Sequence, residues 1–109
     1  GMDTMKAIMA RLRAQAPAEI AGHQVVRTAD YLSHEMKDTA TGAVTAISLP
    51  AANVLTYWLD TGASVIVRPS GTEPKIKCYL LAHGSTVQAC EQVLQHLRRA
   101  VPALLGPQD

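Results

Sequence analysis

The chain has few aromatic residues, little net charge and no long apolar segment, and each shortage excludes a class of protein. Of its 109 residues only four are aromatic, and none is phenylalanine. Ten Lys and Arg stand against nine Asp and Glu, so the net charge of +1 produces no strong field that would attract a polyanion. Nucleic-acid faces normally carry basic and aromatic stripes, and we therefore expect no nucleic-acid partner.

Membrane and metal signals are missing as well. No apolar run approaches the roughly 18 residues needed to span a bilayer, and the N-terminus lacks the layout of a secretion signal. The cysteines, Cys78 and Cys90, have neither metal-ligand nor redox spacing, and the four histidines are scattered. We expect buried thiols, a cytoplasmic location, no membrane partner and no metal or cofactor held by this chain. Gly1 before Met2 resembles the residue left after an affinity tag is removed.

What remains is the composition of an ordinary globular domain, 48% hydrophobic and 17% charged, and we expect one domain over residues 1–109. An apolar stripe from Met5 to Leu12 predicts a first helix, with Asp3 or Thr4 as its cap. Ser85 and Gln88 form a capping-box pattern ahead of a second stripe. That stripe has steps of three and four residues and comprises Val87, Cys90, Leu94, Leu97 and Val101. Arg98 and Arg99 are expected near the end of this last helix, where they would favour its negative pole.

Four segments between these helices read as strands. Residues 54–59 and 63–68 are rich in β-branched and aromatic residues and are joined by a short turn containing Gly62. Residues 75–82 alternate between two faces, whereas residues 24–32 alternate only weakly. Residues 33–43 are polar and predict a surface loop. The pattern predicts an α+β two-layer domain, with a four-stranded antiparallel sheet packed against two main helices.

One segment, residues 68–75, has the composition of an oxyanion site. Arg68 can offer two parallel N–H donors to two oxygens of one anion, and Ser70 and Thr72 supply hydroxyl donors. Gly71 allows either a close backbone approach or a positive φ, so that successive N–H groups can converge. A plain turn between two strands would use the same residue types, and composition alone leaves both interpretations open.

The longer run from Val67 to Lys77 resembles the phosphate-binding loop signature of the α-D-phosphohexomutase superfamily. Asp30-Tyr31, Thr41-Gly42, Leu49-Pro50 and the following Asn53-Val54-Leu55 resemble its phosphoglucomutase/phosphomannomutase branch in the same order. The resemblance implies the last of four domains, with a TATA-binding-protein-like fold. It also implies an enzyme that interconverts hexose 1-phosphate and hexose 6-phosphate, in which this domain clamps the phosphate that is not transferred.

Carried onto this sequence, the resemblance makes Arg68, Ser70, Gly71 and Thr72 the expected phosphate ligands. Lys75 is a further candidate, and Glu73 is expected to order the loop. The serine, magnesium and sugar-recognition loops of the family have no counterpart here, so we expect the chain alone to be inactive. The expected partners are a hexose phosphate and the other domains of the enzyme, which would hold the Mg²⁺. The alternatives are a free-standing anion- or nucleic-acid-binding module, a phosphoglucosamine mutase C-terminal domain, and a structural lid.

Overall fold

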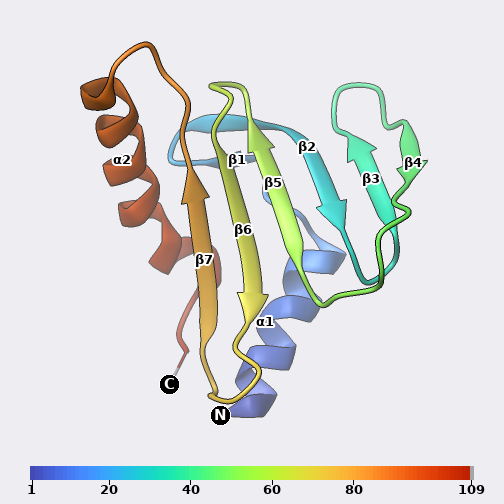
Figure 1. Cartoon of the computed structure of the whole chain (residues 1–109). Helices are drawn as coiled ribbons and strands as arrows, with labels where there is room; N and C mark the ends of the chain where they lie inside the picture. The colour runs from blue at the N-terminus through green and yellow to red at the C-terminus, as the bar shows by residue number, and fades with distance from the viewer. Residues whose placement is uncertain (109) are drawn as a thin grey trace.

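The computed structural model describes residues 1–108, which form two helices and a broad antiparallel sheet (Figure 1). Near the N-terminus lie α1 (Met2–Ala14), β1 (Glu19–Ile20), β2 (His23–Asp30) and β3 (Glu35–Asp38). They are followed by β4 (Val44–Ala46), β5 (Leu55–Leu59), β6 (Ser64–Pro69), β7 (Ile76–Leu81) and α2 (Val87–Leu105). The strands run in the order β4-β3-β2-β5-β6-β7, and β1 pairs with β2 outside this path. Neither described helix is long and apolar enough to cross a membrane.

Both helices pack against the same face of the sheet. Alternate residues of the central strands, among them Tyr57 on β5 and Val65 on β6, are buried in one cluster with the apolar stripe of α1. Leu97 and Leu105 of α2 belong to the same cluster, so the sheet and the helices form the two layers of an α+β fold. The predicted fold class is therefore confirmed.

The sheet is wider than the sequence predicted. Residues 33–43, expected to be a surface loop, contain β3, and β4 follows directly after them. Both strands are short, and nearly all of their residues are exposed. Because neither face is buried, the sequence has no need to alternate apolar and polar residues there. The interpretation of 33–43 as loop was therefore wrong in its middle, and the four predicted strands form the centre and one edge of a seven-stranded sheet.

The helix ends also differ from the sequence prediction. Thr86, and not Ser85, caps α2, since its hydroxyl accepts the Ala89 N–H at 3.0 Å. The cap position of α1 is Gly1, with no side-chain cap, and Asp3 lies inside the first turn. Because α2 continues to Leu105, its last turn carries no basic residue, so Arg98 and Arg99 lie within the helix.

One predicted member of the α2 stripe is not buried. Val87, the first residue of the helix, is 86% exposed, whereas Leu97 further along is fully buried. The stripe therefore reaches the sheet only after the first turn of the helix.

A register shift in β2 explains why its alternation is weak. Val25 pairs with Leu59 and Arg27 pairs with the next residue back, Trp58, so Val26 is an extra residue. Before the shift, the odd-numbered residue Val25 faces the helices. After the shift, the even-numbered residues of β2 pair with helix-facing residues of β5 and therefore face the helices themselves. Arg27 consequently lies on the other face, with its guanidinium carbon 5.6 Å from the centre of the Trp58 ring.

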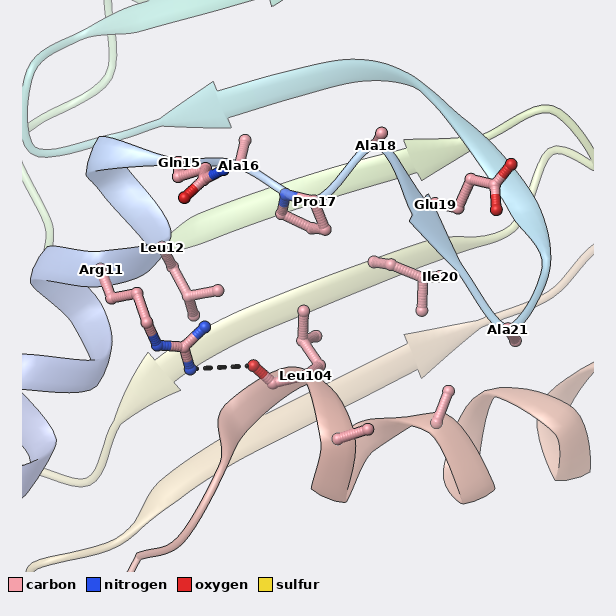
Figure 2. Close-up of a pocket in the computed structure, with 12 residues that line it drawn as sticks. Arg11, Leu12, Gln15, Ala16, Pro17, Ala18, Glu19, Ile20, Ala21 and Leu104 are labelled. Atoms are coloured by element: carbon pink, nitrogen blue, oxygen red, sulfur yellow. Dashed lines mark hydrogen bonds between the residues drawn. The ribbon is translucent and has the colours of Figure 1, made fainter.

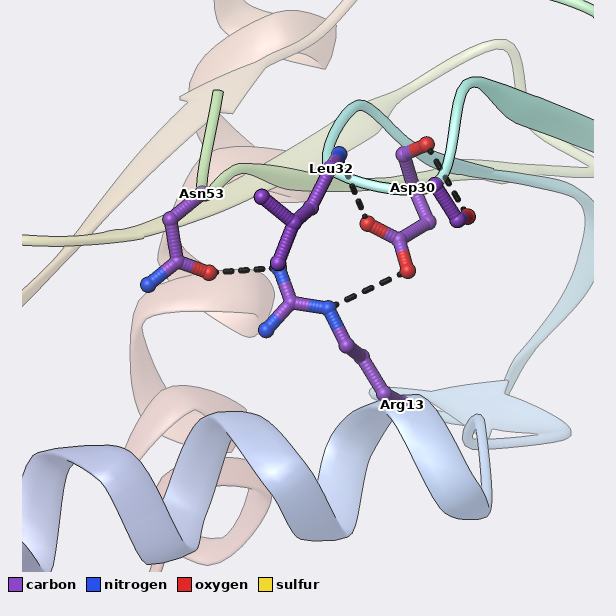
Figure 3. A network of polar contacts seen from close by, with 5 residues as sticks. Arg13, Asp30, Leu32 and Asn53 are labelled. Atoms are coloured by element: carbon purple, nitrogen blue, oxygen red, sulfur yellow. Dashed lines mark hydrogen bonds and ion pairs between the residues drawn. The ribbon is translucent and has the colours of Figure 1, made fainter. Parts of the chain in front are cut away.

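Beyond the shift, the end of β2 is tied to α1 by a polar network (Figure 3). The Arg13 Nε donates to Asp30 Oδ2 at 3.1 Å, and its Nη2 donates to Asn53 Oδ1. Asp30 Oδ1 accepts the Leu32 N–H at 3.0 Å. Both oxygens of the Asp30 carboxylate are thus engaged in structural contacts.

Candidate functional site

The connection between β6 and β7, here called the anion loop (residues 70–75), is closed by its own hydrogen bonds. Ser70 N donates to the Lys75 carbonyl at 2.8 Å, and Lys75 N donates to the Glu73 carbonyl at 2.8 Å. The Ser70 hydroxyl oxygen accepts the N–H groups of Thr72 and Glu73 at 3.4 and 3.3 Å. Ser70 therefore organises the loop, although its own hydroxyl proton is still available to a ligand.

Two cations face each other at the base of the loop. The β6–β7 register places Arg68 directly opposite Lys77, so both side chains project from the same face of the sheet. Directly opposed residues have Cβ atoms about 4.5–5.5 Å apart, and like charges in such a pair repel. Within the described chain neither side chain has an ion-pair or hydrogen-bond partner, and both are exposed. Two cations at this spacing repel each other, and a bound anion would relieve that repulsion.

Lys77 was not among the residues assigned to the site from the sequence. The pairing that sets its charge against Arg68 depends on strand register. A count of the residues in the intervening loop could have suggested the pairing, because a six-residue connection between 69 and 76 leaves 68 and 77 as neighbours.

Lys75 is already engaged within the loop. Its Nζ lies 3.4 Å from Glu73 Oε2, and both side chains are well exposed. Such an exposed ion pair contributes little to stability and exchanges readily. Lys75 is thus held close to the loop by Glu73 but is not locked there.

The structure excludes one of the two reasons considered for a glycine at position 71, the need for a positive φ. Its φ is not positive, so the conformational requirement for glycine does not apply. A Cβ built at Gly71 would meet no atom within 4 Å. The space beside this residue is therefore open and leaves room for the close approach of a ligand.

The structure brings the residues predicted from the sequence together, and they differ in whether their polar groups already have partners. In the described chain, the Arg68 guanidinium, the Gly71 N–H and the Thr72 hydroxyl have no partner, whereas Ser70 and Lys75 do. Between residues 68 and 77 three cations stand against the single carboxylate of Glu73, which gives a local charge of +2. Such a local positive charge, with N–H and O–H donors beside it, is what the recognition of a small dianion would require.

Other parts of the molecule offer less. A cavity of about 520 Å³ lies between the end of α1, β1 and α2, and its lining includes none of the anion-loop residues (Figure 2). No group of three or more His, Cys, Asp or Glu among residues 1–108 could hold a metal ion, so Mg²⁺ has no ligand set in the described chain. Burial raises the pKa of Tyr57 to about 12 and that of Cys78 to about 11, which keeps both groups protonated and unreactive at neutral pH.

The two-layer fold thus presents a cation-bearing loop between β6 and β7. Residues 5–99 match the family model described as phosphoglucomutase/phosphomannomutase, C-terminal domain, and the chain belongs to this family. Its relatives are named phosphoglucomutase and probable phosphomannomutase, so the chain belongs to a family of enzymes.

Individual relatives agree with the family match. The chain is 36% identical over 107 residues to a protein named probable phosphomannomutase from Haemophilus influenzae, covering 94% of this chain and 19% of the relative. It is 36% identical over 80 residues to a phosphoglucomutase from Staphylococcus epidermidis, and 39% identical over 80 residues to one from Staphylococcus aureus. Those matches cover 73% of this chain and 14% of each relative, so the chain spans less than a fifth of the length of the curated relatives it matches.

Proposed function

We propose that the anion loop, together with Arg68 and Lys77, binds the phosphate group of a hexose phosphate. In the assembled enzyme this would be the phosphate that is not transferred during interconversion of hexose 1-phosphate and 6-phosphate. The observation that carries the proposal is the pair of directly opposed, unpartnered cations beside a loop with open donors. Membership in a family whose members are named phosphoglucomutase and phosphomannomutase supplies the sugar phosphate as the ligand class.

Each group would make a different contribution to binding. Arg68 would take two phosphate oxygens with its planar fork, and Lys77 would add a point charge from the neighbouring strand. Gly71 N–H and the Thr72 hydroxyl would donate to the remaining oxygens. Because the loop is already closed by its own hydrogen bonds, little ordering is required when the ligand arrives.

The role of such a clamp is to orient the sugar. Binding of a remote phosphate supplies energy and alignment for a reaction that occurs elsewhere on the same molecule. The phosphoserine and Mg²⁺ that the family resemblance implies would belong to other domains, since the described residues here form no metal ligand set. The chain is therefore proposed to act with those domains and not alone.

An amide NMR titration of the chain with glucose 1-phosphate tests this function, with inorganic phosphate and a short DNA duplex as controls. We expect shifts at Arg68, Gly71, Thr72 and Lys77 with both phosphates, even with affinity as weak as millimolar. The DNA duplex should leave these amides unchanged. Shifts spread over the open sheet face with DNA alone would contradict the proposal and favour a nucleic-acid module. An unchanged spectrum with both phosphates would also contradict it for this chain.

A further inference from the structure

We infer that the C-terminal tail (residues 106–108) positions the outgoing end of the anion loop, and that Gln108 is the positioning residue. The inference rests on the proposed function, because it assigns to the tail an effect on anion affinity. It goes beyond that function, because neither the loop motif nor the family match, which ends at residue 99, includes the tail.

A single long-range hydrogen bond joins the two segments. Ile76 N donates to Gln108 Oε1 at 3.1 Å, across 32 residues of sequence, in a partly buried position. Ile76 is the first residue of β7 and directly follows Lys75, the last residue of the loop. The bond therefore acts at the point where the loop becomes sheet.

The sheet itself cannot satisfy this N–H. Hydrogen-bonded and non-hydrogen-bonded pairs alternate along an antiparallel ladder. Since Ser70 N donates to the Lys75 carbonyl, the next pair, Pro69 with Ile76, is a non-hydrogen-bonded one, and the Ile76 N–H points away from β6. β7 is the last strand in the sheet order, so the described chain has no strand on that side. Gln108 supplies the acceptor that the missing strand would have supplied.

The tail is able to hold Ile76 because its own origin is anchored. Arg11 Nη2 on α1 donates to the carbonyls of Leu104 and Leu105 at 3.1 and 2.9 Å, at the end of α2 (Figure 2 shows the first of these). Gly106, with a φ of 73°, turns the chain there, and its N–H donates to the Pro102 carbonyl at 2.9 Å. From this turn the tail runs beside the start of β7 (Figure 1).

A fixed Ile76 constrains the cations on both sides of it. Lys75 precedes it in the loop, and Lys77 follows it on the strand, opposite Arg68. Loss of the Gln108 bond would leave a partly buried N–H without its acceptor and let the first residue of β7 fray from the sheet edge. Gln108 would thereby alter anion binding without touching the anion.

The test compares Gln108→Ala with Gln95→Ala, an exposed glutamine on α2, in the full 109-residue chain. Amide hydrogen exchange is measured at Ile76 and Ser70 without ligand, and glucose 1-phosphate affinity is measured by NMR titration. We expect Gln108→Ala to speed exchange at both amides and to weaken affinity roughly two- to tenfold, the worth of one net hydrogen bond. Gln95→Ala should change neither.

Gln108→Glu provides the rescue, because its carboxylate retains an oxygen acceptor, and exchange at Ile76 should return toward the rate of the unaltered chain. Unchanged exchange in Gln108→Ala, or faster exchange with unchanged affinity, would overturn the inference. If the unaltered chain bound no phosphate, the proposed function would fail. The positioning of the loop by the tail would then still be decided by exchange at Ser70, which requires no ligand.

Discussion

Glu73 Oε2 lies 3.4 Å from Lys75 Nζ within a six-residue loop, so the one carboxylate of the candidate site restrains one of its three cations. We expect Glu73→Gln to release Lys75, raise the local charge and strengthen glucose 1-phosphate binding by about two- to fivefold, the scale of an exposed ion pair. NMR titration at two salt concentrations would measure this, and the gain should shrink at high salt. Weaker binding by this variant would mean that Glu73 serves chiefly to order the loop.

The opposed pair of Arg68 and Lys77 gives a second prediction. Arg68→Ala should weaken phosphate binding roughly tenfold or more, since charged, bidentate hydrogen bonds are lost. Lys77→Ala should weaken it less, because lysine contributes a point charge. Both variants should keep the thermal stability of the parent chain, as neither side chain is buried and like-charge repulsion is relieved.

Lys6→Ala is the matched control for these variants, since Lys6 is an exposed cation on α1, away from the sheet face that carries the pair. Its phosphate affinity should equal that of the parent chain. A large drop in melting temperature for Arg68→Ala would show that the arginine supports the fold, and the assignment of Arg68 to binding alone would then fail.

Gly71 gives a test in which folding and binding should separate. With no positive φ and no atom within 4 Å of a built Cβ, Gly71→Ala should leave stability unchanged or raise it by up to about 1 kcal/mol. The added methyl group should nevertheless obstruct the anion and weaken its binding. Gly62→Ala is the converse control: its φ of 87° makes alanine strained, so stability should fall while affinity is retained. Equal affinity of Gly71→Ala and the parent would remove Gly71 from the site.

Tyr57 predicts a stability change at high pH. Its hydroxyl is buried without a hydrogen-bond partner in the described chain, and burial raises its pKa to about 12 from 10.0. Between those values the unfolded chain loses the proton first, so this group's contribution to stability falls as pH rises from about 10 to about 12. The two-unit difference corresponds to about 2–3 kcal/mol at most.

Tyr57→Phe isolates this effect. At pH 7 the variant should be as stable as the parent or more so, because a buried hydroxyl without a partner is removed. Urea unfolding at several pH values should show the parent losing stability relative to Tyr57→Phe above pH 10, and not below it. Parallel pH curves for the two proteins would refute the assignment.

The chain by itself should not catalyse mutase turnover. Incubated with glucose 1-phosphate, glucose 1,6-bisphosphate and Mg²⁺, it should form no glucose 6-phosphate above a buffer blank in a coupled assay. The physical reason is that the proposed role of the chain is to clamp a phosphate, and the described residues include no metal ligand set. Turnover that survives repurification and disappears in Arg68→Ala would overturn the proposed division of work between domains.

The sequence predicted those parts of the structure that strong burial patterns encode. The stripe of α1 and the alternation of β7 gave correct elements because each buries one face. β3 was missed because its residues are nearly all exposed, so nothing in their order distinguishes a strand from a loop. Thr86 was missed as a cap because Ser85, with Gln88 three residues later, fits the capping-box pattern, whereas Thr86 is followed at that distance by Ala89.

The candidate site likewise has one part that the sequence predicts and another that it does not. Its local part, the sequence from Arg68 to Lys75, is contiguous and could be interpreted from residue chemistry and family resemblance. Its long-range parts, the opposition of Lys77 to Arg68 and the contact of Gln108 with Ile76, depend on strand register and on the path of the tail. The contact of Gln108 leaves no local signature, whereas the opposition of Lys77 to Arg68 could have been suggested by the length of the loop between the two strands.

The extra residue at Val26 has a consequence for how β2 can vary in length. Because of this one extra position, Val25 before it and Asp30 after it both lie on the helix side, although an unbroken strand would place residues five apart on opposite faces. A chain lacking that single residue could not keep both Val25 in the core and Asp30 beside Arg13, because returning one of them to the helix side would turn the other to the opposite face. The strand therefore tolerates substitution far better than it tolerates a change of length.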